Sequence, residues 1–254
     1  MCPWDAVIFG FGVAEYRLGA ALPSAGLRNA LLSWSTATGT KLLCSRARPE
    51  DAQSLASLED LDFRFVDMAI KASLPSLEQI RAPATSVPVR RALPEDREGV
   101  LRIAGAAFHS GRYHADPLFP KDLAHRRYQT WMAAAMDSPS EADQVFVVGK
   151  PGAPRGFFHV AVMGEFAHMK LAAADAELGS GLEGYALYEG TLRKLREAGV
   201  RRAEAVFSPS NPAVMNLYAA LGFRFAEPEV IFHRHATGAC RPKAGDDRAI
   251  QGEA

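Results

Sequence analysis

The stretch NLYAALGFRF at residues 216–225 has a second version earlier in the chain, LASLEDLDFRF at residues 55–65. In both, leucines at helical spacing are followed by a single connecting residue, Gly222 or Asp62, and then by the tripeptide Phe-Arg-Phe. A glycine just past the last helical residue is typical of a left-handed C-terminal cap. The sequence therefore predicts a helix-to-strand junction that occurs twice, once in each half of the chain.

The helix before Gly222 has a clear beginning. Asn211 is a good N-cap and Pro212 suits the first helical position, so the pattern predicts a helix of about ten residues. Tyr218 follows Asn211 by close to two helical turns, which places both side chains on roughly the same face. Taken alone, Tyr218 is best explained as a side chain packed on a sheet.

A glycine-rich turn, Gly179-Ser180-Gly181 with Gly184 three residues later, precedes the longest amphipathic helix of the second half. Glycines at a helix N-terminus let backbone N–H groups approach a phosphate. The pattern lacks the Lys-Ser/Thr of a Walker loop and is not a dinucleotide-binding fingerprint. A plain tight turn and a phosphate-binding turn are therefore both compatible with it.

Composition limits the class of protein. The 254 residues are 48% hydrophobic and carry 29 basic and 29 acidic side chains. Balanced charge disfavours nucleic acid and anionic membranes as partners. The three cysteines lack metal-ligand spacing, no segment reaches membrane-spanning length, and the N-terminus lacks a basic signal region. We therefore expect a cytoplasmic protein without a metal site, and a homodimer stays open.

The order of the expected elements divides the chain into two α/β parts. Residues 1–73 form a short first part, and the Pro-, Ser- and Ala-rich residues 74–86 predict a linker. Residues 87–236 predict a mixed α/β domain whose front half is antiparallel. Residues 237–254 are expected to be a disordered tail.

In this order, the pieces of residues 87–235 resemble the GNAT superfamily of acyl-CoA-dependent N-acetyltransferases. The most specific part is Asn211-Pro-Ala-Val-Met-Asn-Leu-Tyr218-Ala-Ala-Leu-Gly222-Phe223, which is similar to the family's Asn-x-x-Ala-x-x-x-Tyr-x-x-x-Gly-Phe segment. The resemblance implies that acetyl-CoA binds beside a splayed strand, with its pyrophosphate on the glycine-rich turn. The cofactor-binding residues that it implies are Leu171, Ala172, Ala173, Gly179, Ser180, Gly181, Gly184 and Asn211.

The two-part organisation resembles the two-domain dTDP-fucosamine acetyltransferases of bacterial surface-polysaccharide synthesis. The segments that carry this resemblance are Pro3-Trp4-Asp5, Phe9-Gly10-Phe11 and AAFHSGRYHADPLFP at residues 106–120. It implies an α/β fold with a mixed sheet, in which a smaller partial GNAT-like domain precedes a complete GNAT domain. The repeated junction would then mark two related units, and convergence on a good helix stop is the alternative.

Acyl transfer needs a neutral amine, a donor for the thioester oxyanion and a proton for the departing thiolate. The resemblance assigns the proton to Tyr218 and the oxyanion donor to the backbone near Ala173. Strand alternation places His168, Lys170 and Ala172 on one face, and His168 titrates in the range of a general base. A structural histidine is the other interpretation of His168.

The loop after the first helix of the second part is expected to bind the acceptor. Arginine pairs with a diphosphate, and an aromatic ring stacks on a base or a sugar. The residues expected to do so are Arg112, Tyr113, His114, Asp116 and Phe119. We therefore expect acetylation of a dTDP-linked amino sugar. For the loop itself, a polar surface loop without a ligand is the alternative. For the function, the alternatives are an acyltransferase for another small amine, such as an antibiotic precursor or amino acid, and a catalytically silent acyl-CoA-binding protein. Leu178 and Glu183 keep the silent protein open, because they depart from the family's phosphate-binding turn.

Overall fold

The structure, a computed structural model, describes residues 2–19, 26–80, 87–175 and 181–236. The expected tail and part of the expected linker, residues 81–86, lie outside these ranges. The elements of the first half are, in order, α1 (Pro3–Phe9), β1 (Gly12–Glu15), α2 (Leu27–Thr38), β2 (Thr40–Ala47), α3 (Ala52–Asp60), β3 (Arg64–Leu74) and the short 3-10 helix η1 (Leu77–Gln79).

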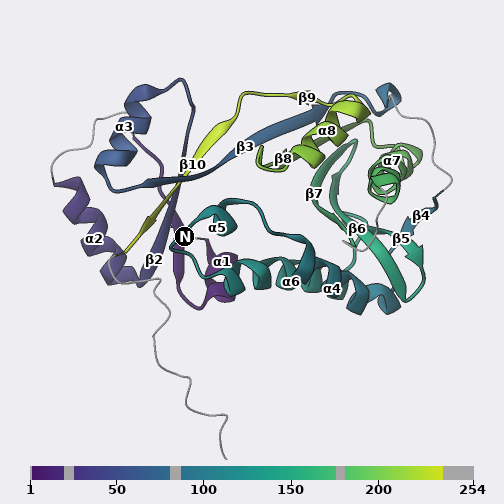
Figure 1. Ribbon diagram of the computed structural model, residues 1–254, viewed down its shortest axis with the longest axis horizontal. Helices are drawn as coiled ribbons and strands as arrows, with labels where there is room; N and C mark the ends of the chain where they lie inside the picture. The colour runs from purple at the N-terminus through teal and green to yellow at the C-terminus, as the bar shows by residue number, and fades with distance from the viewer. Residues whose placement is uncertain (1, 20–25, 81–86, 176–180, 237–254) are drawn as a thin grey trace, which may run out of the picture.

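The second half begins with an antiparallel group of strands and ends with alternating helices and strands. Its elements are, in order, β4 (Val89–Arg91), the 3-10 helix η2 (Pro94–Asp96), α4 (Arg97–Ala107), α5 (Arg112–Ala115), α6 (Lys121–Asp137), β5 (Asp143–Lys150), β6 (Ala153–Met163), β7 (Phe166–Ala174), α7 (Gly181–Glu197), β8 (Arg202–Phe207), α8 (Pro212–Leu221), β9 (Arg224–Phe225) and β10 (Glu229–His235). The molecule is elongated, with α2 and α3 at one end and α7 at the other (Figure 1).

The two halves share one sheet. In the described parts of the chain, ten strands follow the order β1-β2-β10-β3-β8-β7-β6-β5-β4, with β9 paired to β3. The first part of β3, up to Ala69, pairs antiparallel with β10, and its second part, from Ile70, pairs antiparallel with β8. β10 in turn lies between β2 and β3. The halves that the sequence separates at residue 73 therefore exchange strands in space.

The first Phe-Arg-Phe junction joins α3 to β3 through a left-handed residue. Asp62 has φ 65°, and it is the one non-glycine residue with positive φ in the described chain. The N–H of Asp62 donates to the carbonyl of Glu59 at 2.9 Å, and the N–H of Phe63 donates to the carbonyl of Leu58 at 2.9 Å. These two bonds are those of a Schellman motif, which closes the end of a helix.

The second junction, between α8 and β9, repeats this geometry. Gly222 has φ 92°. Its N–H donates to the carbonyl of Ala219 at 3.1 Å, and the N–H of Phe223 donates to the carbonyl of Tyr218 at 3.0 Å. The phenylalanine that follows the left-handed residue is buried at both junctions, as Phe63 and as Phe223. The repeated sequence therefore folds into the same helix stop twice, as its pattern predicts.

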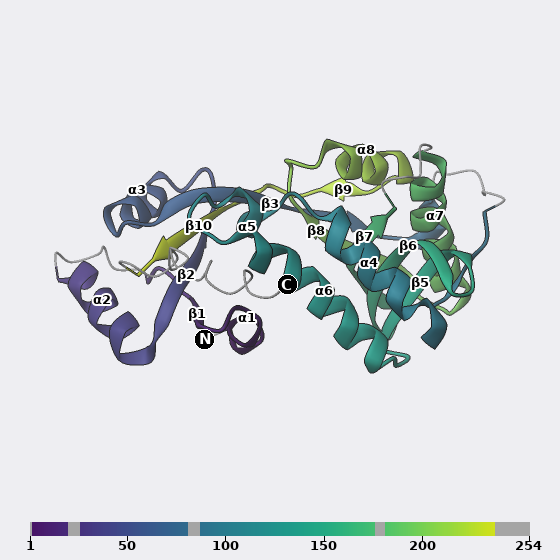
Figure 2. The same cartoon turned by 60° about the horizontal axis from the view of Figure 1, so that its bottom comes forward.

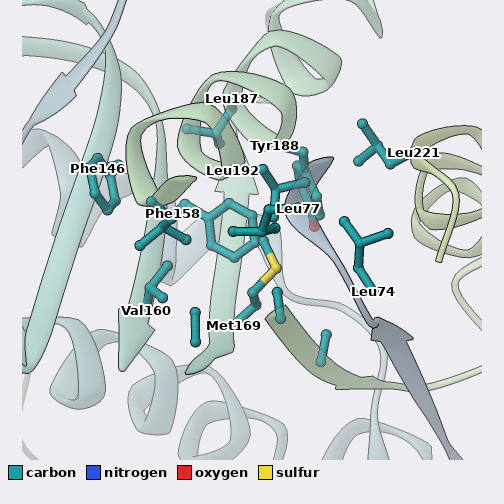
Figure 3. Close-up of a cluster of buried hydrophobic side chains, with 14 of the residues drawn as sticks. Leu74, Leu77, Phe146, Phe158, Val160, Met169, Leu187, Tyr188, Leu192 and Leu221 are labelled. Atoms are coloured by element: carbon teal, nitrogen blue, oxygen red, sulfur yellow. The ribbon is translucent and has the colours of Figure 1, made fainter. Parts of the chain in front are cut away.

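Helices cover both faces of the sheet in the second half (Figures 1 and 2). Alternate residues of β5 point to opposite faces, as a strand requires. The cluster under α7 and α8 is shown in Figure 3 and includes Leu74, Leu77, Phe146, Phe158, Val160, Met169, Leu187, Tyr188, Leu192 and Leu221. The cluster under α4 and α6 includes Val100, Ile103, Ala104, Met132, Ala135, Val145, Val147 and Phe157. Apolar side chains therefore pack against both faces of the sheet in the second half.

The described helices include none that combines the length and the apolar character required to cross a lipid bilayer.

We expect Gly222→Ala to lower the free energy of unfolding by about 1 kcal/mol, because a Cβ is strained in the left-handed region. Gly222→Asn should lose less, since asparagine tolerates this conformation better than alanine does. Urea unfolding of the two variants beside the wild type measures both effects. Equal stability of all three proteins would contradict the cap geometry.

A chain that begins at Ser86 lacks β1, β2 and β3, so β8 loses a neighbour and β10 loses both of its own. Unpaired strand edges promote aggregation. We expect this fragment to aggregate or to lack a cooperative unfolding transition in size-exclusion chromatography and circular dichroism. A chain that ends at residue 228, before β10, should fail in the same way although it keeps the first half. A monodisperse, cooperative second half would contradict the exchange of strands.

Candidate functional site

Strands β7 and β8 run parallel and then separate. They pair from Phe166 opposite Arg202 to Met169 opposite Ala205. β7 continues to Ala174, but no further pair between the two strands occurs in the described residues. On its other side, β7 stays paired with β6 to its end. The sheet therefore opens beyond Met169, where the edge of β7 can offer backbone groups to a ligand.

A β-bulge lies where this gap begins. His159 of β6 stands opposite Leu171, and the next residue, Val160, stands opposite Met169. Lys170 is thus an extra residue in β7. Bulges locally bend a strand and reset the alternation of its side chains.

The bulge changes which side chains of β7 share a face. Ala167 and Met169 belong to the cluster under α7 and α8, so His168 and Lys170 point away from it. Beyond the bulge, Ala172 packs against that same cluster. The prediction that His168, Lys170 and Ala172 share one face is therefore wrong, because the extra residue moves Ala172 to the opposite face.

A cavity of about 590 Å³ lies at the gap between the strands. It brings together four of the residues expected to bind a cofactor, which are Ala172, Ala173, Gly184 and Asn211. The side-chain oxygen of Asn211 accepts from the N–H of Val214 at 3.2 Å. This cap fixes Asn211 at the cavity wall, while the alanines of β7 leave the gap free of large side chains.

The other expected cofactor residues do not line this cavity in the described part of the chain. Leu171 packs against the cluster under α4 and α6. Gly181 is the first residue of α7, and Gly184, in the first turns of that helix, has no heavy atom within 4 Å of an added Cβ. The N-terminus of α7 therefore lies beside the cavity, where its dipole favours an anion. Gly179 and Ser180 lie outside the described residues.

Tyr218 is buried next to the cavity rather than in its wall. Its ring meets that of Tyr188 edge-on at 5.5 Å, and Tyr188 lines the cavity. Burial, with a smaller contribution from Tyr188, raises the pKa of the Tyr218 phenol well above its ordinary value. Tyr218 therefore holds its proton at neutral pH, as a proton donor must.

His168 does not line this cavity. It stands between Ala161 of β6 and Glu204 of β8, on the face away from α7 and α8. Burial, followed by the charge of Lys170, lowers the pKa of His168 below its ordinary value. The neutral imidazole can accept a proton, but its use as a general base stays a prediction.

A second cavity, of about 360 Å³, lies on the face of β7 that carries Lys170. Its wall includes the side chains of Trp4, Arg127, Trp131, Asp143, His159 and Lys170. Lys170 lines this cavity and Ala172 lines the first one, and two residues of a strand span roughly 6.5 Å. The two cavities therefore lie on either side of the bulged segment.

A hydrogen-bonded chain fixes the floor of the second cavity. The indole N–H of Trp131 donates to Nδ1 of His159 at 2.9 Å, and Nε2 of His159 lies 2.9 Å from Oδ1 of Asp143. Since an indole N–H can only donate, the proton of neutral His159 is on Nε2, which donates to Asp143. Lys170 Nζ donates to the same Asp143 oxygen at 2.6 Å. Sequence reasoning missed this chain, although the antiparallel pairing expected in the front half of the second part brings Asp143 of β5 close to His159 of β6.

The loop expected to bind the acceptor is largely buried. Tyr113 and Phe119 are each 2% exposed and pack edge-on against Phe9 of α1 at 5.1 and 4.8 Å. Neither ring has a free face for a ligand. The prediction that Tyr113 or Phe119 stacks on a nucleotide base is therefore wrong, because α1 of the first half covers them.

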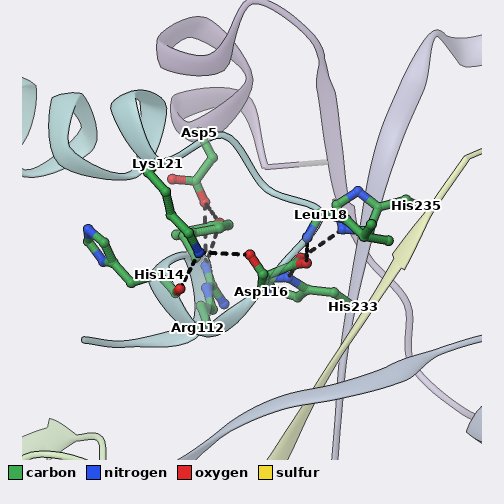
Figure 4. A network of polar contacts seen from close by, with 9 residues as sticks. Asp5, Arg112, His114, Asp116, Leu118, Lys121, His233 and His235 are labelled. Atoms are coloured by element: carbon green, nitrogen blue, oxygen red, sulfur yellow. Dashed lines mark hydrogen bonds and ion pairs between the residues drawn. The ribbon is translucent and has the colours of Figure 1, made fainter. Parts of the chain in front are cut away.

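The charged residues of this loop are also engaged (Figure 4). The hydroxyl of Tyr113 donates to Asp5 at 2.8 Å, and Arg112 donates to that hydroxyl at 2.9 Å and lies 3.5 Å from Asp5. His114 packs against Tyr128, and burial first, then His125, lower the pKa of His114 to about 4. The loop thus ties α1 to α5, and the diphosphate-binding role expected of Arg112 gains no support from its position.

Solved structures share this fold, although their sequences differ widely from this one. No model of a known protein family matches the sequence, and no curated protein matches it. A solved GCN5-related N-acetyltransferase from Sphaerobacter thermophilus is similar over 88% of this chain and 72% of that chain, with 15% identity and a TM-score of 0.61. A conserved protein of unknown function from Staphylococcus epidermidis is similar over 87% and 83%, with 11% identity and a TM-score of 0.63.

A tandem GNAT protein from the clavulanic acid biosynthesis pathway is similar over 84% of this chain and 70% of that chain, with 16% identity and a TM-score of 0.53. At such identities, the likeness concerns the fold. It confirms the expected mixed α/β architecture, in which a smaller GNAT-like unit precedes a GNAT fold.

Proposed function

We propose that this protein is an acyl-CoA-dependent N-acyltransferase, with acetyl-CoA as the donor, and that the donor binds in the gap between β7 and β8. The observation that carries the proposal is the end of pairing at Met169, together with the cavity of about 590 Å³ at the gap. An extended ligand with amide groups, such as pantetheine, can bond to an open strand edge as an added strand does. The GNAT-like fold supports this assignment.

The residues present fit a donor that carries a diphosphate. The gap ends beside the N-terminus of α7, a helix of 17 residues. Backbone N–H groups and the dipole of a helix N-terminus bind phosphate oxygens. The open space at Gly184 lets a ligand approach the backbone there. The proposed donor would therefore lie along β7, with its thioester near the bulge and its phosphates at α7.

The chemistry would be divided among a backbone donor, a phenol and a base. An N–H on the open edge of β7 near Ala173 would stabilise the thioester oxyanion. Tyr218 would give a proton to the departing thiolate, after a small movement past Tyr188. His168 is neutral and lies on the other face of β7. It would take the proton of the acceptor amine directly or through water.

The acceptor would lie in the second cavity, between the two halves of the chain. Trp4, which is 40% exposed, and Trp131 supply aromatic surface there. The guanidinium of Arg127 lies over both rings, and its Nε donates to Asp5 at 2.8 Å. We propose a nucleotide-linked amino sugar as the acceptor, with its base against Trp4 instead of Tyr113. This choice rests on the sequence resemblance, and another small amine is the alternative.

A side chain that fills the donor cavity should abolish donor binding without unfolding the protein. Ala213 lines the cavity and is exposed, so Ala213→Phe adds bulk at little cost in folding. We expect acetyl-CoA to raise the melting temperature of the wild type by several degrees, since a ligand at 100 times its Kd adds about 2.7 kcal/mol. Ala213→Phe should lose most of this shift.

Ala219→Phe is the matched control, because Ala219 is exposed on the same helix and lies outside the cavity wall. It should keep the full shift. An unshifted wild type would count against the proposed function, whereas equal shifts in both variants would move the donor to another site.

Tyr218→Phe should lower kcat by roughly 10²-fold and leave KM for acetyl-CoA little changed, because the ring packing stays and the donated proton is lost. Thiol release with a nucleotide-linked amino sugar and with a panel of free amines measures turnover and also tests the acceptor. Tyr188→Phe, which removes a neighbouring buried hydroxyl, is the control and should keep most of the rate. Wild-type turnover in Tyr218→Phe would remove Tyr218 from the mechanism.

A further inference from the structure

Three side chains capable of binding a metal meet outside the two cavities described above (Figure 4). Asp116 comes from the segment after α5, whereas His233 and His235 come from β10. The two histidines are two positions apart on a strand, with Arg234 between them, so both point to the same face. One ligand atom from each of the three residues lies within 4.8 Å of the others. Distant parts of the sequence therefore converge on one point.

The three side chains are already aligned through one oxygen. Oδ2 of Asp116 lies 2.7 Å from Nδ1 of His233 and 2.7 Å from Nε2 of His235. Asp116 is 2% and His233 1% exposed. The other oxygen of Asp116 accepts from the N–H of Leu118 at 2.9 Å. The carboxylate is thus held in place by contacts that leave Oδ2 directed at both imidazoles.

The donor set suits a divalent ion of the zinc class. Two imidazole nitrogens and one carboxylate oxygen, at about 2.0–2.1 Å from the ion, are common ligands of Zn²⁺. A tetrahedral arrangement at those lengths separates neighbouring ligand atoms by roughly 3.3 Å. The observed 2.7 Å separations therefore need to widen by only about 0.6 Å for an ion to replace the shared protons.

The three side chains border a cavity, so an ion bound by them would have space on one side. A cavity of about 750 Å³ is lined by the three side chains. Its wall also carries Glu59, whose negative charge favours a cation, and Arg64, which opposes one. Asp62 lines the wall too, but it is ion-paired with Arg28. Three protein ligands with space for a fourth are typical of a zinc site that holds water or a small ligand.

We propose that Asp116, His233 and His235 bind one Zn²⁺-class ion, with a fourth coordination position that faces this cavity. The site would join the segment after α5 to β10, and so connect the middle of the chain to its last described strand. It departs from the expectation of a protein without a metal site. It is independent of the acyl transfer proposed above, because none of its ligands lines the donor cavity.

The test uses the full chain, stripped of metal with a chelator and then titrated with Co²⁺. We expect a 1:1 complex with the visible absorption bands of four-coordinate Co²⁺, and competition by Zn²⁺ with a Kd at or below about 1 µM. His235→Ala should weaken binding by at least ~100-fold. His109→Ala, which removes an exposed histidine elsewhere, should leave binding unchanged.

Folding of each variant is checked by circular dichroism. Should His235→Ala fail to fold, Asp116→Asn keeps the shape of the side chain while removing its charge, and should also lose the Co²⁺ bands. Absence of a 1:1 complex in the wild type, or equal binding by wild type and a folded ligand variant, would overturn the proposal. The three residues would then be a hydrogen-bonded clamp only.

Discussion

The pairing of β3 with two sets of strands is the constraint on which the rest of the structure depends. Its first part borders β10 and its second part borders β8, the strand that forms one side of the gap. A shift of one residue in either ladder would turn the side chains of β3 to the opposite face. The left-handed Asp62 just before β3 helps fix where the strand begins. The position of the gap beside β8 is thus tied to a junction in the other half of the chain.

The extra residue in β7 links the two cavities. Without Lys170 as a bulge, strict alternation would put Ala172 on the face that carries His168. With it, Ala172 lines the cavity at the gap, whereas Lys170 lines the cavity on the other face. A thioester and an amine could therefore approach the same short segment of backbone from opposite directions. Under the proposed function, this separation would keep the donor and the acceptor from competing for one space.

Features that rest on local sequence could be predicted, and features that rest on distant neighbours could not. Asn211 and Gly222 mark the ends of α8 by their own backbone preferences, so the helix and the fold around it followed from the sequence. The bulge at Lys170 has no local signal, because it depends on the register with β6. Tyr113 and Phe119 look like surface aromatics in a polar loop. Only the fold reveals that α1, more than a hundred residues away, covers them.

The position of β10 between β2 and β3 also constrains when the sheet can form during synthesis on the ribosome. β3 ends at Leu74, and the strand that must insert beside it begins at Glu229. At roughly 5–20 residues per second, translation needs on the order of ten seconds to bridge that interval. During this time, β2 and β3 of the nascent chain wait with open edges. Chaperone binding and slow codons in that window would therefore influence yield more than they do for a domain whose strands pair with near neighbours.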